Sequence, residues 1–320
     1  MKRIFKLVFV AGVFAAGILA LPFAGSEDEP VQASRLSAPN AGMTVYFPFI
    51  ALAPTPTPPP PPPPPDWLVY LNSVRGLGNL PPVAQNAAWN TDAYNHSAYV
   101  VQNDIWAPFA YGIVTGDFQI RTDRWAIDQW IVAPFHGLQM IDSRLTQAGF
   151  GSYRQSKSGL QMAATLDVLR GRSVGPLAGV SYPVMWPANN KTVSYTRYPG
   201  GEYPDPGSHC PGYNGMPIYL QLGPGTVTPG IQATALWHAG QLLDTCWFDE
   251  NSYWNPDDTA RDYGRSILHE RSAVILMPRD PLNAGWGYTV QIVNNGAMIS
   301  WYFTVSDTAY APLKPAAAIR

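Results

Sequence analysis

A run of prolines at positions 54–65 divides this chain more sharply than any other feature of its sequence. Ten of these residues are proline, and Thr55 and Thr57 are the exceptions. Proline fixes φ and lacks a backbone N–H, so the run adopts the extended polyproline II form. It predicts a stiff spacer of roughly 35–40 Å, which is favoured over a binding site for proline-recognising modules. The folded part is expected to begin near Asp66.

The N-terminus has the pattern of an export signal. Cations at positions 2, 3 and 6 precede an apolar run from Leu7 to Ala24, and small residues follow. This order predicts a signal peptide over residues 1–25. The run is also about 18 residues long, so an uncleaved membrane anchor is the alternative. Either way, we expect a secreted or cell-surface protein.

Residues 26–65 are predicted to be a linker, disordered at first and then polyproline. Within it lies an apolar island, Val45 to Leu52. The island either docks onto the folded part as a lone strand or sits against the cell envelope, and the sequence does not favour one of these. Residues 308–320 are expected to be a C-terminal tail.

Cysteine content and charge exclude several classes of protein. Cys210 and Cys246 are the only cysteines. In an exported chain they predict one disulfide, and since neither belongs to a CxxC pair, metal or redox chemistry at sulfur is not expected. The formal net charge of −2 becomes −5 once the three N-terminal cations are removed. Such a chain lacks the basic surface that nucleic-acid binding requires.

The pattern after the spacer predicts an α+β unit over residues 66–175. Asp66 is placed to cap a helix whose apolar face includes Trp67, Leu71 and Val74. Two further helices are expected over 91–103 and 124–135. A hairpin is expected from strands at 149–153 and 160–169, with a turn at 156–159.

The sequence of residues 176–307 has a different hydrophobic pattern from that of residues 66–175. Short apolar or alternating runs are separated by Gly and Pro, which predicts an all-β sandwich. The expected strands are 182–186, 218–222, 231–238, 273–277, 288–293 and 299–305. A short helix over 259–270 is the exception.

One group of motifs in the first unit resembles a known family. Trp130 stands six residues before His136, and Gly149-Phe150-Gly151 enters a strand thirteen residues after the histidine. A Gln-Met-Ile-Asp turn lies at 139–142, and His96 is followed by Ser-Ala-Tyr-Val. These spacings resemble the CAP superfamily, which includes cysteine-rich secretory proteins, venom allergens and plant pathogenesis-related proteins.

The resemblance covers residues 66–172 and implies an α-β-α sandwich. In the family, two histidines and two acidic residues line a cleft that in some members binds a divalent cation. The second histidine corresponds to His136, and the Gly-Glu-Asn motif corresponds to Gly116-Asp117-Phe118. The first histidine is missing near Ala107, and the other acidic position, near Ala133, is neutral.

These departures shape what is expected of the cleft. One histidine and one aspartate are fewer ligands than a zinc site needs, and no nucleophile motif is visible. We therefore predict a cleft without metal, cofactor or catalysis, with His136, Asp117, Trp130 and His96 as candidate residues. A structural role is favoured for three of them: His136 bonded to neighbouring backbone, His96 within its helix, and Asp117 in a turn.

The second unit resembles the immunoglobulin-like modules of bacterial surface proteins. The resemblance rests on the runs Val274–Leu282, Tyr288–Val290 and Trp301–Val305. Cys210 and Cys246 would then pin an irregular insertion around 200–213 to a strand near Trp247.

Two loops of this unit carry further candidates. The stretch from Tyr198, Tyr-Pro-Gly-Gly-Glu-Tyr-Pro, either contacts carbohydrate or peptide or is a rigid surface loop, and the second is favoured. A loose acidic group lacks the alternating spacing of a calcium loop. Its members are Asp249, Glu250, Asp257 and Asp258.

The leading hypothesis is an extracellular binding or interaction protein. Its ligand would be apolar or amphipathic, because relatives in the CAP superfamily are implicated in lipid and sterol binding. A cell envelope or an extracellular polymer is the other partner expected. A hydrolase that acts on such polymers with His136 as base is the second hypothesis. A purely structural surface module is the third.

Overall fold

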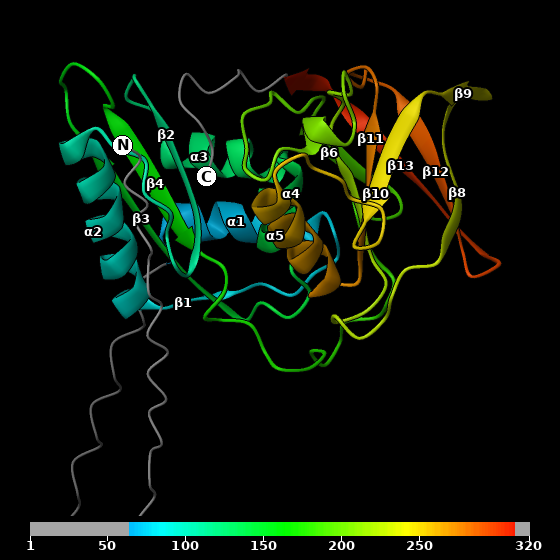
Figure 1. Ribbon diagram of the computed structural model, residues 1–320, viewed down its shortest axis with the longest axis horizontal. Coiled ribbons are helices and arrows are strands. Elements are labelled where there is room, and N and C mark those ends of the chain that lie inside the picture. Colours follow the sequence, from blue (N-terminus) through cyan, green and yellow to red (C-terminus); the bar gives the residue numbers. More distant parts are fainter. Residues whose placement is uncertain (1–63, 311–320) are drawn as a thin grey trace, which may run out of the picture. The chain divides into compact units, whose positions relative to one another are not determined.

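The computed structural model describes residues 64–310 as a mixed α+β protein with helices α1–α5 and three β-sheets (Figure 1). The predicted signal peptide, the apolar island at 45–52, most of the proline run and the end of the tail lie outside these residues. Within 64–310, no helix combines the length and the apolar character that crossing a membrane requires.

Helix α1, Asp66–Gly76, begins directly after the last prolines. Its buried face contains the predicted Trp67, Leu71 and Val74. The predicted cap was wrong: Pro65 occupies the N-cap position, no side chain caps the helix, and Asp66 is its first residue. Proline suits this place because the first backbone N–H groups of a helix have no partner within it.

Helix α2, Ala87–Asn103, starts four residues before the predicted 91, because Asn86 provides the cap. The Asn86 side chain accepts a hydrogen bond from the Trp89 N–H. The helix lies very close to strand β3, Gln147–Arg154. A side chain at Gly151 would collide with the α2 backbone at Tyr94, so this approach requires glycine.

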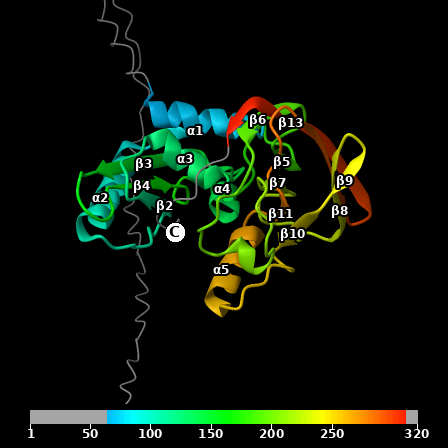
Figure 2. The ribbon, with the colours of Figure 1, turned by 90° about the horizontal axis from the view of Figure 1, so that it is seen from above.

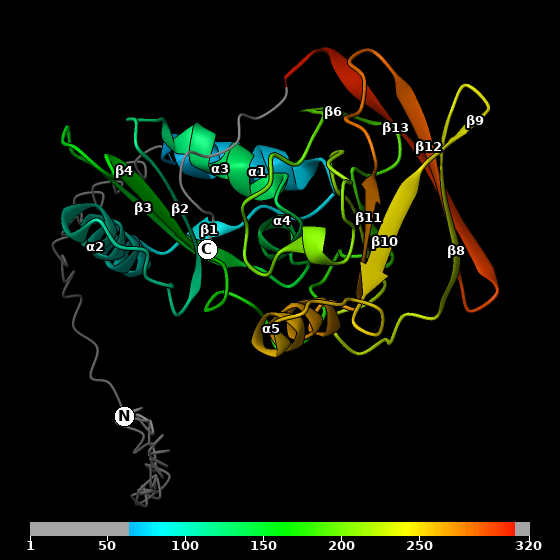
Figure 3. The same cartoon turned by 45° about the horizontal axis from the view of Figure 1, so that its top comes forward.

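The first sheet has the strand order β1-β3-β4-β2. The predicted hairpin is confirmed as the antiparallel pair of β3 and β4, Met162–Asp167. Strands β1, Ala84–Gln85, and β2, Gly112–Asp117, were not predicted. Helix α2 lies on one face of this sheet, and α1 and α3 lie on the other (Figures 1 and 3).

The third predicted helix is two helices in the structure. Helix α3 spans Asp123–Ile131, and α4 spans Pro134–Met140. Pro134 cannot donate a backbone hydrogen bond, so it ends the first helix and starts the second. This break places His136 in the first turn of α4.

The second half contains a four-stranded and a five-stranded sheet. In the first the order is β10 (Thr245–Asp249), β11 (Ala273–Pro278), β7 (Ile218–Gln221), β5 (Val184–Trp186). In the second it is β6 (Lys191–Tyr195), β13 (Ala297–Tyr310), β12 (Gly287–Asn294), β8 (Ile231–His238), β9 (Gln241–Leu243). Helix α5, Asp258–His269, matches the predicted short helix, and a 3-10 turn spans Pro206–Ser208. Strands β6 and β9 were not predicted, and β10 is the strand expected near Trp247.

A domain boundary was predicted between residues 175 and 176, but one hydrophobic core contains residues from both sides of it. Trp186 of β5 is fully buried and donates from Nε1 to the Val74 carbonyl of α1 at 2.9 Å. The Tyr219 hydroxyl of β7 donates to the Ile131 carbonyl of α3 at 2.8 Å. Figure 2 shows α4 lying beside β7 and β11. The first sheet, its helices and the β7 sheet therefore hold one another in place.

The predicted disulfide is confirmed. Cys210 and Cys246 are bonded, with their Cα atoms 5.8 Å apart. The bond joins the loop before β7 to β10, which fixes one end of the insertion that follows β6.

Candidate functional site

A pocket of about 340 Å³ lies where the first sheet meets the loop after β6 and helix α5. This volume is in the range of small-molecule sites. Its walls come from the start of β2, from α4, from the loop after β6 and from α5. The lining residues are Pro108, Phe109, Gly112, Ile113, His136, Gln139, Tyr203 and Tyr263.

The polar end of the pocket is a pair formed by His136 and Glu202. The Nδ1 atom of His136 lies 2.8 Å from Oε2 of Glu202. Both side chains are almost completely buried, with 3% of the histidine and none of the glutamate exposed. Because Nδ1 bonds to the carboxylate, Nε2 is the ring nitrogen available to a molecule in the pocket.

The start of α4 holds this pair in place. Glu202 also accepts hydrogen bonds from the backbone N–H groups of Phe135 and His136, at 3.1 and 3.2 Å. These donors have no partner within the helix, and the positive end of the helix dipole favours a carboxylate there. The break at Pro134 is what exposes them to Glu202.

Burial is the main influence on this carboxylate. It raises the pKa of Glu202 above the ordinary value, and the hydrogen bond from His136 opposes the rise. The glutamate thus depends on its three donors for a charged form inside the protein. The arrangement fixes the orientation of the imidazole.

The other predicted cleft residues lie elsewhere. His96, on α2, bonds from Nε2 to the Ala107 carbonyl at 3.1 Å, and burial lowers its pKa. Its ring packs on Phe109 with centroids 5.0 Å apart, so it supports the pocket wall from behind. Asp117 binds the Arg121 side chain at 3.3 Å, at the end of β2.

Trp130 is fully buried, and its ring lies edge-on to Phe150. Neither Trp130 nor Asp117 is among the described residues that line the pocket. Of the four predicted cleft candidates, the structure therefore brings only His136 to the pocket surface.

The sequence analysis did not place Glu202, Gln139, Tyr203 or Tyr263 at the cleft, although a ligand-contacting loop was the less favoured interpretation of the stretch with Glu202 and Tyr203. Glu202 lies in the stretch that was interpreted as a rigid surface loop, yet its carboxylate is enclosed between α4 and that loop. A lone glutamate among Gly, Pro and Tyr carries no local signal of burial. Its partner is 66 residues away, so only the tertiary structure identifies the pair.

The residues present do not match the metal site of the CAP superfamily. His96 and Asp117 are bonded to other groups, which leaves His136 and Glu202, fewer ligands than a divalent cation site needs. Within 64–310, one group of three metal-ligand side chains has its donor atoms together, namely His209, Cys210 and Cys246. The two sulfurs of that group are joined in the disulfide and are not ligands.

Two carboxylates of the loose acidic group accept hydrogen bonds from nearby backbone N–H groups. Oδ1 of Asp249 accepts from the N–H groups of Asn251 and Ser252, at 2.9 and 2.8 Å. Oδ1 of Asp257 caps helix α5 by accepting from the Thr259 N–H at 2.8 Å. These carboxylates shape a turn and a helix end, and the described part of the chain does not gather them into one site.

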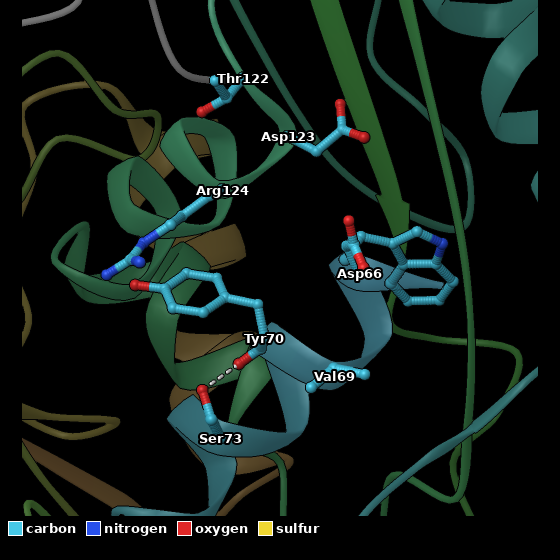
Figure 4. Close-up of a pocket in the computed structure, with 8 residues that line it drawn as sticks. Asp66, Val69, Tyr70, Ser73, Thr122, Asp123 and Arg124 are labelled. Carbon is cyan, nitrogen blue, oxygen red and sulfur yellow. Dashed lines mark hydrogen bonds between the residues drawn. The ribbon is translucent and has the colours of Figure 1, made fainter. Parts of the chain in front are cut away.

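A larger hollow, about 490 Å³, lies beside α1 and the start of α3 (Figure 4). Two of its polar side chains are already engaged: Thr122 caps α3, and Asp123 binds Arg154. Arg124 covers the ring of Tyr70 with its guanidinium carbon 4.4 Å from the centroid. Among the described residues that line this hollow, none is a histidine or another group suited to acid–base chemistry at neutral pH, so the smaller pocket at His136 is the stronger candidate.

No protein-family model matches this sequence, and no curated protein matches it either. The resemblance of residues 66–172 to the CAP superfamily remains a prediction from the motifs around His136.

Proposed function

We propose that this chain is an exported binding protein, secreted or held at the cell surface, which holds a small apolar or amphipathic molecule in the His136 pocket. The observation that carries the proposal is the contrast between the walls and one end of the pocket. Phe109 and Ile113 provide apolar walls, and His136 with Gln139 provides a polar end. Apolar pockets with a few convergent polar groups are typical of small-molecule sites.

The arrangement favours a ligand with an apolar body and one hydroxyl or carboxyl group. The body would lie against Phe109 and Ile113, and the polar group would bond to Nε2 of His136. Tyr203 and Tyr263 stand at the mouth, with 41% and 46% of their surfaces exposed. Their rings would cover the part of the ligand nearest the solvent.

Binding of fluorescent fatty-acid and sterol analogues to the purified protein tests the proposal. We expect saturable binding to the wild type, weakened about tenfold or more by Phe109→Ala and by Tyr263→Ala. Tyr99→Ala is the matched control, since Tyr99 is an exposed tyrosine on α2, away from the pocket. Wild-type protein that binds neither analogue, and carries no lipid when purified, would contradict the proposal.

A second function is favoured by the His136–Glu202 pair itself. A buried carboxylate bonded to Nδ1 orients an imidazole as a general base, with Nε2 toward the substrate. No serine, threonine or cysteine is among the described residues that line the pocket, so water would be the nucleophile. The reaction class would be hydrolysis of a bond in an envelope or extracellular polymer.

Hydrolytic assays separate the two functions. Purified cell-wall material and chromogenic esters are incubated with the wild type, with His136→Gln and with the matched control His269→Gln, whose imidazole is exposed. Activity that His136→Gln abolishes and His269→Gln retains would establish the hydrolase and displace the binding proposal. Protein without activity or ligand would support a structural module.

A further inference from the structure

The outer face of the five-stranded sheet is an accessible surface with a regular arrangement of side chains. Strand β12 alternates between buried residues such as Val290 and partly exposed residues such as Gln291. In Figures 1 and 3, the helices and strands β10 and β11 all lie on the other side of this sheet. Within residues 64–310, the outer face therefore belongs to the surface.

Two aromatic residues stand in one row across this face. Thr289 of β12 pairs with Trp237 of β8 on one side and with Tyr302 of β13 on the other. Directly paired residues project to the same face of a sheet. Because Trp237 and Tyr302 are two strands apart, their positions are separated by about 10 Å.

Both rings lean over the central strand. The Trp237 indole donates from Nε1 to Oε1 of Gln291 at 3.0 Å, which draws the ring across β12. A side chain at Gly287 would collide with the phenol ring of Tyr302, so that ring covers the β12 backbone at Gly287. Both rings therefore reach over β12 on the outer face, where 42% of the Tyr302 surface is exposed and Trp237 is partly exposed.

The residues around the rings are uncharged. Thr289 stands between the two rings in the same row, and Gln291 and Ser300, which pair with each other across β12 and β13, place an amide and a hydroxyl in the next row on this face. Leu242 of β9 pairs with Trp237, and 60% of its surface is exposed. A face of this kind has no complement for a phosphate, a carboxylate or a cation. It suits a neutral partner with both apolar C–H surfaces and hydroxyl groups.

We propose that this face binds an extended neutral polysaccharide. The C–H faces of two sugar rings would pack on Trp237 and Tyr302. The sugar ring between them would lie over Thr289, with Gln291 and Ser300 in the next row within reach of its hydroxyls. Aromatic side chains provide a large contact surface at low entropic cost, which suits them to this role. The face is separate from the His136 pocket, so it would hold the protein on a polymer whatever the pocket binds.

Affinity electrophoresis of the full chain tests the proposal, in native gels that contain xylan, mannan, mixed-linkage β-glucan or hydroxyethyl cellulose. We expect at least one of these to retard the wild type. Trp237→Ala and Tyr302→Ala should each raise the apparent Kd about tenfold or more. Gly287→Ala, which displaces the Tyr302 ring without removing it, should weaken retardation as well. Trp254→Ala is the control, since Trp254 is 52% exposed and belongs to the loop before α5.

Thermal unfolding of each variant shows whether the fold is retained. Gly287→Ala moves the Tyr302 ring but keeps its apolar surface, so it tests whether binding depends on where the ring lies. The proposal is overturned if no polymer retards the wild type, or if Trp237→Ala and Tyr302→Ala are retarded as strongly as the wild type. It is overturned equally if the wild type sediments as a dimer and the double variant as a monomer. In that case the face would be an interface between two copies of this chain.

Discussion

The carboxylate of Glu202 lies 2.8 Å from Nδ1 of His136, although 66 residues separate the two along the chain. The contact joins the loop after β6 to the first turn of α4. Since the same carboxylate accepts two backbone N–H groups, it fixes both the helix start and the imidazole. The polar end of the pocket thus depends on two distant parts of the sequence.

Because of this dependence, we predict that substitutions of Glu202 lower the stability of the fold, and that Glu202→Ala lowers it more than Glu202→Gln. Glu202→Ala leaves the N–H groups of Phe135 and His136, and the imidazole, without their buried acceptor. We expect the free energy of unfolding to fall by roughly 3–5 kcal/mol. Glu202→Gln keeps the volume and one acceptor oxygen, so it should cost about 1–2 kcal/mol. Urea denaturation followed by tryptophan fluorescence measures both.

Glu250→Ala is the control for this series. Glu250 also pairs with a histidine, but in this pair the histidine is in water: 64% of the His269 side chain is exposed, against 10% of Glu250. Pairs that remain in water contribute less than about 1 kcal/mol. Equal losses for Glu202→Ala and Glu250→Ala would show that burial of the His136 pair does not determine its contribution.

The local features of this fold were predictable from sequence. The buried faces of α1 and α2 follow the helical spacing of Trp67, Leu71 and Val74 and of Ala93 and Val100. Periodicity reports which side of an element is apolar, and that side is buried against any core. Hydrophobic periodicity therefore predicts the buried face of a helix even when the element packed against that face is unknown.

The site itself could not be predicted in the same way. Asp117 and Trp130 were expected at the cleft because of family spacing, whereas the pocket is completed by Tyr203 and Tyr263 from the second half. Such contacts depend on how distant elements pack. A proline in the middle of an apolar stretch, Pro134, was the one local sign that α4 would begin where it does.

A second prediction concerns the buried charge of Asp142. Its carboxylate lies 3.0 Å from Nε of Arg271, and both side chains are almost fully buried. Burial opposes ionisation, but Arg271 and Arg144 hold the pKa of Asp142 below its ordinary value. Asp142→Asn removes the nearer and fully buried counter-charge of the Arg271 guanidinium and leaves it the longer pair with Glu270, at 3.6 Å. We expect the free energy of unfolding to fall by roughly 3–5 kcal/mol in urea denaturation.

Asp244→Asn provides the comparison, because Asp244 and Arg279 form an ion pair at the surface, with about half of each side chain exposed. Its denaturation midpoint should stay at the wild-type value. The prediction for Asp142 fails if the two asparagine variants have the same midpoint.

The disulfide supports a third prediction. Cys210 and Cys246 close a loop with a sequence separation of 36 residues. A cross-link of this span restricts the unfolded chain and contributes roughly 3–4 kcal/mol. Reduction should lower the unfolding free energy of the wild type by this amount. The double variant Cys210→Ser, Cys246→Ser should start at the lower value and not respond to reductant. A wild type that is insensitive to complete reduction would contradict the prediction.

The fourth prediction is a pH dependence that arises at His209, beside the disulfide. Nδ1 of His209 accepts from the Trp254 N–H at 3.1 Å, and Nε2 donates to the Trp247 carbonyl at 3.2 Å. An imidazole that accepts at one nitrogen and donates at the other is neutral. Burial lowers the pKa of His209 below its ordinary value of 6.5, and the bond to Trp247 only partly opposes this.

The sign of the effect follows from which state binds the proton. Below pH 6.5 the unfolded chain protonates this histidine, while the folded protein keeps it neutral until a lower pH. Stability contributed by His209 is therefore present above pH 6.5 and is lost as the pH falls toward the folded pKa. Urea denaturation at about pH 7.5 and about pH 5.5 should show a difference that His209→Gln reduces and His269→Gln, at an exposed position, does not. An undiminished difference in His209→Gln would assign the acid sensitivity to other groups, such as His96, whose pKa burial also lowers.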